Sequence, residues 1–208
     1  MEITLSDGKA LIAFARKNIE TYLKTNKPLP VPAEIKEKYK ENAGAFVTLN
    51  RYPKTGNPLR GCIGYILPVY PLWETISKVS LSAAFDDPRF PSVKASEMDN
   101  IVVEVSILTV PEEIKVDIPE DYLKHIKIGR DGLIITRAWN RGLLLPQVPV
   151  EFDRNWDVTT FLEHTCMKAG LPPNAWKDVG KTKVERFTAI IFEEEYPRGP
   201  IVPKKIGE

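Results

Sequence analysis

Cys62 is the residue of this sequence that is best placed for nucleophilic chemistry. It lies in the run Leu59-Arg60-Gly61-Cys62-Ile63-Gly64, on a predicted strand. A thiolate is a strong nucleophile and a cationic neighbour stabilises it, so Arg60 would lower the pKa of Cys62 if their side chains converged. The alternative is a packing role, because a strand cysteine is usually a small buried apolar residue.

Gly61 and Gly64 flank Cys62, and each lacks a side chain that would keep another group away. Glycine inside a strand permits the close approach of a ligand or of another backbone. The spacing from Gly56 to Gly61 matches a phosphate-binding loop, but Cys62 and Ile63 follow where that loop needs Lys and Ser or Thr. A nucleotide loop is therefore rejected. Paired cysteine or His-Glu-x-x-His zinc motifs are also absent from the sequence, so no structural zinc site is expected.

His164 is the second candidate for catalysis, because an imidazole can act as a general base toward a thiol. On the predicted helix it projects about 120° away from the apolar stripe, since each residue turns the helix by about 100°. It could also be a ligand or an ordinary residue at the edge of the core. Cys166 lies beside the stripe and is interpreted as packed.

Three further polar residues could bind a substrate. Asp87 and Arg89 stand in the proline-bounded run Asp86-Asp87-Pro88-Arg89-Phe90-Pro91 and could bind a metal, orient an imidazole or pair with each other. Gln147 follows a predicted strand, where its amide could recognise a ligand or satisfy the backbone. Arginine suits the anionic groups of substrates, so Arg60 and Arg89 are assigned to that role.

Composition narrows the function classes. The 208 residues carry a formal charge of +1, so nucleic acid is not an expected partner without a local patch. Such a patch would need exposed aromatic residues beside cations, as in Arg137, Trp139 and Arg141.

No apolar stretch is long enough to span a membrane, and two cysteines are too few for a disulfide scaffold, which predicts a cytoplasmic protein. The single glutamine, with abundant Lys and Glu, predicts a thermophile protein that melts above about 60 °C.

The apolar periodicity predicts mixed helices and strands without βαβ alternation, which favours an α+β fold with antiparallel pairing. A Ser6-Asp7 cap is expected to start the first helix, and Asn140-Arg141-Gly142 to form a hairpin turn. Residues 196–208 are expected to lie on the surface or fray. Helices are predicted near residues 10–23, 33–41, 73–85 and 157–169, and strands near 45–50, 59–66, 101–110, 133–139, 143–145 and 184–192.

Four segments, taken together, resemble the AMMECR family, which is named for a human candidate gene in a deletion syndrome with Alport features. They are Leu59-Arg60-Gly61-Cys62-Ile63-Gly64, Asp87-Pro88-Arg89-Phe90, Leu144-Leu145-Pro146-Gln147-Val148 and Phe161-Leu162-Glu163-His164-Thr165-Cys166. The resemblance covers residues 5–198 and leaves 199–208 as a tail. It implies an antiparallel sheet flanked by helices, with a second, smaller α+β subdomain.

The resemblance also implies an archaeal, stand-alone protein, with Memo-like and radical S-adenosylmethionine proteins as possible partners. It implies no established reaction, and fold alone does not give one. Three functions stay open: an enzyme or enzyme component built on Cys62 and His164, a non-catalytic protein- or ligand-binding module, and RNA or modified-base recognition. The sequence identifies no cofactor, and it leaves the oligomeric state open, a homo-oligomer included.

Overall fold

The computed structural model of the chain describes residues 2–150 and 154–204, which form two units with separate cores. Unit 1 comprises the chain up to Leu108 together with Ile190–Lys204, and unit 2 comprises Thr109–Ala189. The predicted α+β class with antiparallel sheets is confirmed. Within residues 2–150 and 154–204, no helix has both the length and the apolar character that crossing a membrane would require.

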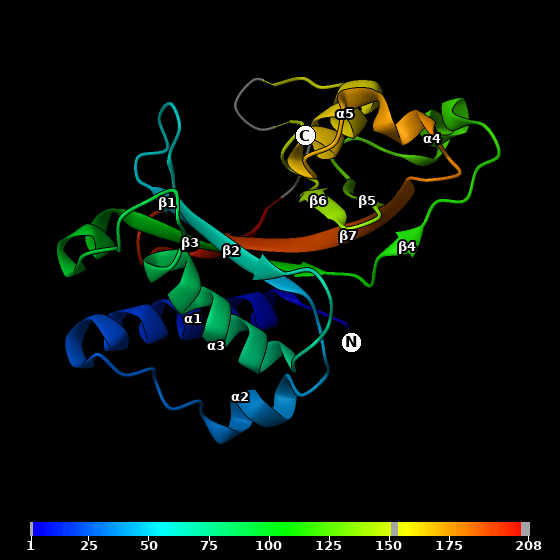
Figure 1. Ribbon diagram of the computed structural model, residues 1–208. Helices are drawn as coiled ribbons and strands as arrows, with labels where there is room; N and C mark the ends of the chain where they lie inside the picture. Colours follow the sequence, from blue (N-terminus) through cyan, green and yellow to red (C-terminus); the bar gives the residue numbers. More distant parts are fainter. Residues whose placement is uncertain (1, 151–153, 205–208) are drawn as a thin grey trace. The chain divides into compact units, whose positions relative to one another are not determined.

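Unit 1 contains a sheet in the strand order β2-β1-β3-β7, with β8 paired to β7 (Figure 1). Its strands are β1 (Ala45–Arg51), β2 (Leu59–Tyr65), β3 (Ile101–Leu108), the last part of β7 (Lys183–Glu194) and β8 (Ile201–Pro203). Its helices are α1 (Leu5–Thr25), α2 (Ala33–Lys38), α3 (Leu72–Phe85) and the 3-10 helix η1 (Ala95–Asn100).

The core of unit 1 lies between this sheet and helices α1 and α3, which pack against each other and against the strands (Figure 1). Successive strand residues point to opposite faces of a sheet. Val47 and Val103 therefore enter the core, whereas Thr48 and Glu104 lie on the opposite face of the same strands. That second face carries Cys62, because Cys62 pairs with Thr48.

Unit 2 has the antiparallel strand order β6-β5-β7-β4. Its core contains Phe161, Leu162 and Cys166 of α5 together with Trp176, and Cys166 is fully buried as predicted. Its elements are β4 (Glu112–Glu113), β5 (Asp131–Arg137), β6 (Asn140–Leu144), the first part of β7, α4 (Tyr122–His125), α5 (Val158–Lys168), η2 (Pro119–Asp121) and η3 (Pro173–Lys177).

Three local predictions were wrong. Thr4, not Ser6-Asp7, caps α1, and the Asp7 carboxylate accepts the Thr4 N–H in a reciprocal capping box. The turn between β5 and β6 lies at Ala138 and Trp139 rather than at residues 140–142, which belong to β6. In the segment expected to be a surface tail, Ile201–Pro203 forms β8, because its backbone pairs with β7.

Candidate functional site

Cys62 lies on β2, the outer strand of the unit 1 sheet, with its side chain half-buried. The hydroxyl of Thr48, directly opposite on β1, lies 3.3 Å from the Cys62 sulfur and donates a hydrogen bond to it. Cys62 is thus one of the polar residues on the sheet face that lies away from α1 and α3. The sulfur is held by a defined partner, and the residue as a whole is partly exposed.

The backbone of Cys62 is held by the loop that contains Asp87 and Arg89, two residues that the sequence analysis named as candidates. The Cys62 N–H donates to the Asp87 carboxylate at 2.9 Å, and the Arg89 guanidinium donates to the Cys62 carbonyl at 3.3 Å. Arg89 also binds Asp87 through two side-chain hydrogen bonds of 2.9 and 2.7 Å. Asp87 and Arg89 therefore satisfy the edge of β2 at Cys62, in the way that another strand would.

These contacts fix the charge state of Asp87. The hydrogen bond from Arg89 is the main cause that lowers the pKa of Asp87 to about 2, although burial opposes it. The Asp87 carboxylate is buried, whereas the Arg89 side chain is 48% exposed. Of this pair, Arg89 is the member that can also meet a ligand from solvent.

Arg60 does not take the position that the sequence suggested. Its side chain is 3% exposed and forms two hydrogen bonds with the Glu97 carboxylate, at 2.8 and 3.1 Å. The charge of Arg60 is therefore matched by Glu97 inside unit 1. This environment favours a structural role for Arg60, and contact with a substrate stays a prediction.

Burial raises the pKa of the Cys62 thiol to about 11, against an ordinary value of about 8.5. The hydrogen bond from Thr48 and the charge of Arg89 lower the pKa, while the charges of Glu104 and Asp87 raise it. All four of these residues belong to unit 1. In these surroundings Cys62 is a protonated thiol at neutral pH.

Two charged neighbours of this site were missed from the sequence. Glu104 lies across β1 from Cys62, is 2% exposed, and accepts a hydrogen bond from the Lys204 ammonium at 2.8 Å. The one sequence feature that could have identified Glu104 was its position as a glutamate inside the β-branched run of residues 101–110. Lys204 gave no signal, because the segment around it was expected to lie on the surface.

The spaces beside Gly61 and Gly64 are occupied by the protein itself. A Cβ atom on Gly61 would lie 2.0 Å from the Ala83 carbonyl oxygen, and one on Gly64 would lie 2.2 Å from the Phe46 ring. Gly61 thus permits the close approach of α3 to β2, which is the backbone alternative left open by the sequence. Binding of a substrate by these glycines stays a prediction.

His164 and Gln147 lie in unit 2. The imidazole of His164, on α5, stacks on the Trp156 indole with ring centroids 4.0 Å apart and planes 9° from parallel. Gln147 is buried in the turn that follows β6. Cys62 and His164 belong to different units, and their pairing as a catalytic dyad stays a prediction.

Asp87 and Glu104, the two carboxylates beside Cys62, form separate ion pairs with Arg89 and Lys204 rather than a shared centre. Among residues 2–150 and 154–204, no cluster of three or more His, Cys, Asp or Glu side chains could hold a metal ion. The chemistry that can be assigned to these residues is that of a thiol, two carboxylates and a half-exposed guanidinium.

Comparison with known proteins identifies the family. The AMMECR1 family model matches residues 12–192. A protein of Pyrococcus abyssi is 54% identical over 202 residues, which cover 96% of each chain, and one of Methanocaldococcus jannaschii is 52% identical over 204 residues, which cover 98% of each. The crystal structure of a Pyrococcus horikoshii protein superposes with a TM-score of 0.89 at 54% identity and covers 95% of this chain and 96% of that one. The chain therefore belongs to the AMMECR1 family.

Proposed function

We propose that this protein is an enzyme, or a component of one, in which Cys62 is the nucleophile or the point of covalent attachment. The observation that carries the proposal is the way in which Cys62 is held. Its backbone N–H and carbonyl are bound by Asp87 and Arg89, its sulfur by Thr48, and its side chain remains partly exposed. A cysteine that only fills space needs none of these polar contacts, whereas a reacting group must be positioned.

The proposal requires a base, because burial keeps the Cys62 thiol protonated at neutral pH. We assign that role to His164, whose imidazole can accept the thiol proton while the sulfur attacks an electrophilic carbon of the substrate. The proton then resides on the imidazole, from which it can return to a leaving group. The Trp156 ring that stacks on His164 would fix the orientation of the imidazole.

Arg89 defines the substrate class in this proposal. Its guanidinium uses Nε and Nη2 to bind Asp87, and 48% of the side chain faces solvent. A guanidinium held in this way presents a fixed positive charge close to Cys62, to whose carbonyl it is hydrogen-bonded. We therefore expect substrates that carry a carboxylate or phosphate near the electrophilic carbon.

Two alkylating reagents that differ only in charge test this assignment. In a Cys166→Ser background, the rate of Cys62 alkylation by anionic iodoacetate is divided by the rate with neutral iodoacetamide, so that differences in thiolate content cancel. Arg89→Gln should lower this ratio about fivefold, which corresponds to about 1 kcal/mol of attraction between charges. Arg198→Gln, which removes another arginine of unit 1 with a 48% exposed side chain, is the matched control. An equal ratio in the Arg89→Gln and wild-type proteins would remove the anion assignment.

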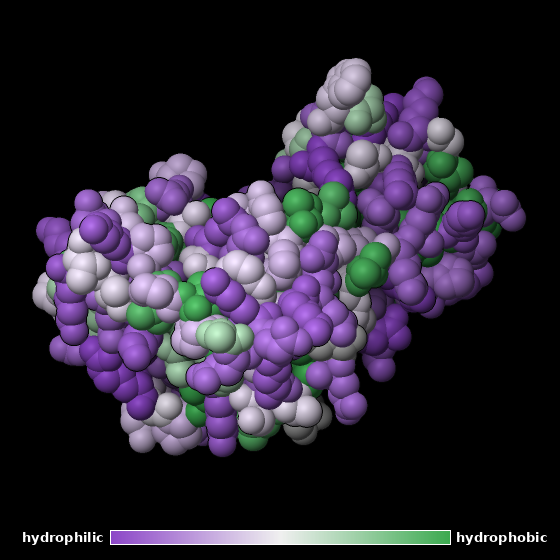
Figure 2. All heavy atoms as spheres, turned by 90° about the horizontal axis from the view of Figure 1, so that it is seen from below, coloured by the Kyte–Doolittle hydropathy of each residue, from purple (hydrophilic) through white to green (hydrophobic). Residues whose placement is uncertain are grey.

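The non-catalytic binding module is less well supported. It predicted a fully buried Cys62 beside a large exposed apolar patch, whereas Cys62 is half-buried. On the face seen in Figure 2, apolar residues occur in small groups among hydrophilic ones. Such a pattern is ordinary for a protein surface.

A second candidate function is recognition of single-stranded RNA or of a modified base, and Trp139 supports it. The Trp139 side chain is 99% exposed at the turn between β5 and β6, with Arg137 and Arg141 two residues away on either side. Indole rings stack on bases, and arginines bind the phosphates that flank them. Because the net charge is near neutral, binding of nucleic acid requires a local basic patch, and this turn provides one.

Fluorescence anisotropy with a labelled 12-nucleotide RNA tests this second function. Trp139→Ala should weaken binding about tenfold, because one stacked base contributes about 1–3 kcal/mol. Tyr52→Ala, which removes a 41% exposed aromatic ring of unit 1, should leave the affinity unchanged. Binding that is equally strong without Trp139 would exclude the turn as the RNA site.

A further inference from the structure

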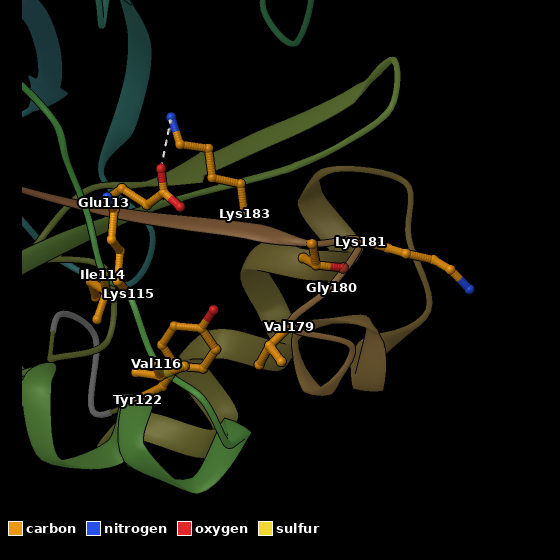
Figure 3. Close-up of a pocket in the computed structure, with 10 residues that line it drawn as sticks. Glu113, Ile114, Lys115, Val116, Tyr122, Val179, Gly180, Lys181 and Lys183 are labelled. Atoms are coloured by element: carbon orange, nitrogen blue, oxygen red, sulfur yellow. Dashed lines mark ion pairs between the residues drawn. The ribbon is translucent and has the colours of Figure 1, made fainter.

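Unit 2 contains a pocket of about 320 Å³ whose lining includes none of the residues of the candidate site (Figure 3). It lies between the chain that follows β4, helix α4 and the turn that leads into β7. Its volume is at the lower end of the range for small-molecule sites, which is about 300–1,000 Å³. The lining residues are Glu113, Ile114, Lys115, Val116, Tyr122, Val179, Gly180, Lys181, Thr182 and Lys183.

Tyr122 is the residue that points to a ligand. Only 3% of it is exposed, yet its hydroxyl has no hydrogen-bond partner within residues 2–150 and 154–204. In Figure 3 the hydroxyl points into the space between Glu113, Lys183 and Gly180. The residue is largely buried, but its hydroxyl oxygen opens to the pocket, so it is free to bond a group that enters there.

The hydroxyl is available as a donor. Burial, followed by the negative charge of Glu113, raises the pKa of Tyr122, so the phenol keeps its proton at neutral pH. A protonated phenol can donate one hydrogen bond to an acceptor inside the pocket.

Three lysines and one carboxylate line the pocket, which gives the lining itself a positive charge. Lys183 binds Glu185 at 2.9 Å and lies 3.8 Å from Glu113, and Lys181 lies 3.6 Å from Asp178. Lys115 differs, because it has no ion pair within the described part of the chain. The lining therefore includes, besides the Tyr122 donor, one ammonium that no carboxylate of the described chain pairs with.

We propose that this pocket binds a small organic oxyanion, with the Tyr122 hydroxyl donating to the oxyanion and Lys115 neutralising its charge. The apolar side chains of Ile114, Val116 and Val179 would contact the carbon body of the ligand. The anionic head is a phosphate or a carboxylate, and both fit this set of donors. The site is independent of Cys62 and adds a binding function to unit 2.

Titrations with glycerol 3-phosphate and with butanoate test the proposal and distinguish the two heads, and glycerol serves as the uncharged control. Amide chemical shifts of Gly180 and Thr182, measured by NMR on the complete chain, report on the pocket. Both amides should shift with at least one of the two anions and not with glycerol. Tyr122→Phe should weaken the binding about tenfold, because a hydrogen bond to a charged group is lost while the ring remains.

Two further variants separate an anion site from other outcomes. Glu113→Gln should strengthen binding severalfold, because it removes the one carboxylate of the lining; a cationic ligand would respond in the opposite direction. Lys115→Gln should weaken binding severalfold, whereas Lys124→Gln, on the adjacent α4 and 75% exposed, should not change it. No shift with either anion at 20 mM (about twentyfold above a 1 mM dissociation constant), or equal affinity in Tyr122→Phe, would overturn the proposal.

Discussion

Three buried polar groups of unit 1 have partners within the protein, whereas the Tyr122 hydroxyl at the pocket of unit 2 has none in the described part of the chain. In unit 1, Arg60 is matched by Glu97, Asp87 by Arg89, and the Tyr39 hydroxyl by Asp7. In the pocket of unit 2, the Tyr122 hydroxyl has no partner among residues 2–150 and 154–204. Paired groups hold a structure in place, whereas unpaired ones are available to a ligand.

This difference explains why Cys62 and Tyr122 suit different tasks. Cys62 is held at its backbone by Asp87 and Arg89 and at its sulfur by Thr48, as a reacting atom must be. Tyr122 is rigid through its edge contact with Trp176, with ring centroids 6.4 Å apart, but its hydroxyl remains available. Measurements of stability can separate the two kinds of polar group.

The largest effect is expected at the most buried ion pair of unit 1. Glu194 binds the guanidinium of Arg16, and the two side chains are 3% and 8% exposed. Glu194→Ala would leave the buried Arg16 charge with only the longer contact to the Glu20 carboxylate, at 3.6 Å, which should lower the free energy of unfolding by about 3–5 kcal/mol. Glu74→Ala, at an exposed pair with Lys78, is the control and should change stability by less than about 0.5 kcal/mol. Urea unfolding measures both.

Asp87→Asn should have the next largest effect. The pKa of Asp87 is lowered from 3.8 to about 2, so its contribution to stability is present above pH 4 and is lost as the pH falls toward 2. At about 1.4 kcal/mol per pKa unit, the substitution should remove about 2 kcal/mol at pH 7. The variant and the wild type should converge near pH 2. Asp86→Asn, at the exposed neighbouring residue, should show no such pH dependence.

Two tyrosine substitutions provide the smallest and most direct comparison. Tyr39→Phe should cost about 1–2 kcal/mol, because the Tyr39 hydroxyl donates to the Asp7 carboxylate at 2.9 Å. Tyr122→Phe should leave stability within about 0.5 kcal/mol of the wild type, because no protein hydrogen bond is lost. Equal losses in the two variants would mean that the Tyr122 hydroxyl is satisfied by the protein, and the contrast between the units would disappear.

Periodicity predicted the longer helices and strands, but not the short elements β4, α4 and β8 or the turn between β5 and β6. Asn140-Arg141-Gly142 has the composition of a hairpin turn, but a Cβ atom on Gly142 would lie 2.3 Å from the Ala169 amide nitrogen. The glycine is needed where β6 approaches the end of α5. The turn then falls on Ala138, which adopts a positive φ of 52°. Local propensity does not reveal such a tertiary requirement.

The candidate site, too, could be predicted only in part, because its contacts depend on tertiary structure. Cys62, Asp87 and Arg89 stood out by residue type, and their hydrogen bonds join positions 25 and 27 residues apart. Thr48 and Glu104 were not identified, because only the register of β1 with β2 and β3 places them in a row with Cys62. The sequence specifies which side chains exist, while strand register decides which of them meet.

The rate of Cys62 alkylation by iodoacetamide as a function of pH tests the central proposal most directly, in a Cys166→Ser background. If His164 is the base, the midpoint of the rate profile should lie below about 8.5. His164→Ala should then move the midpoint up toward the value of about 11 to which burial raises the pKa of this thiol, and His125→Ala should not. A midpoint near 11 with and without His164, or no reaction until the protein unfolds, would contradict the proposal that Cys62 and His164 act together.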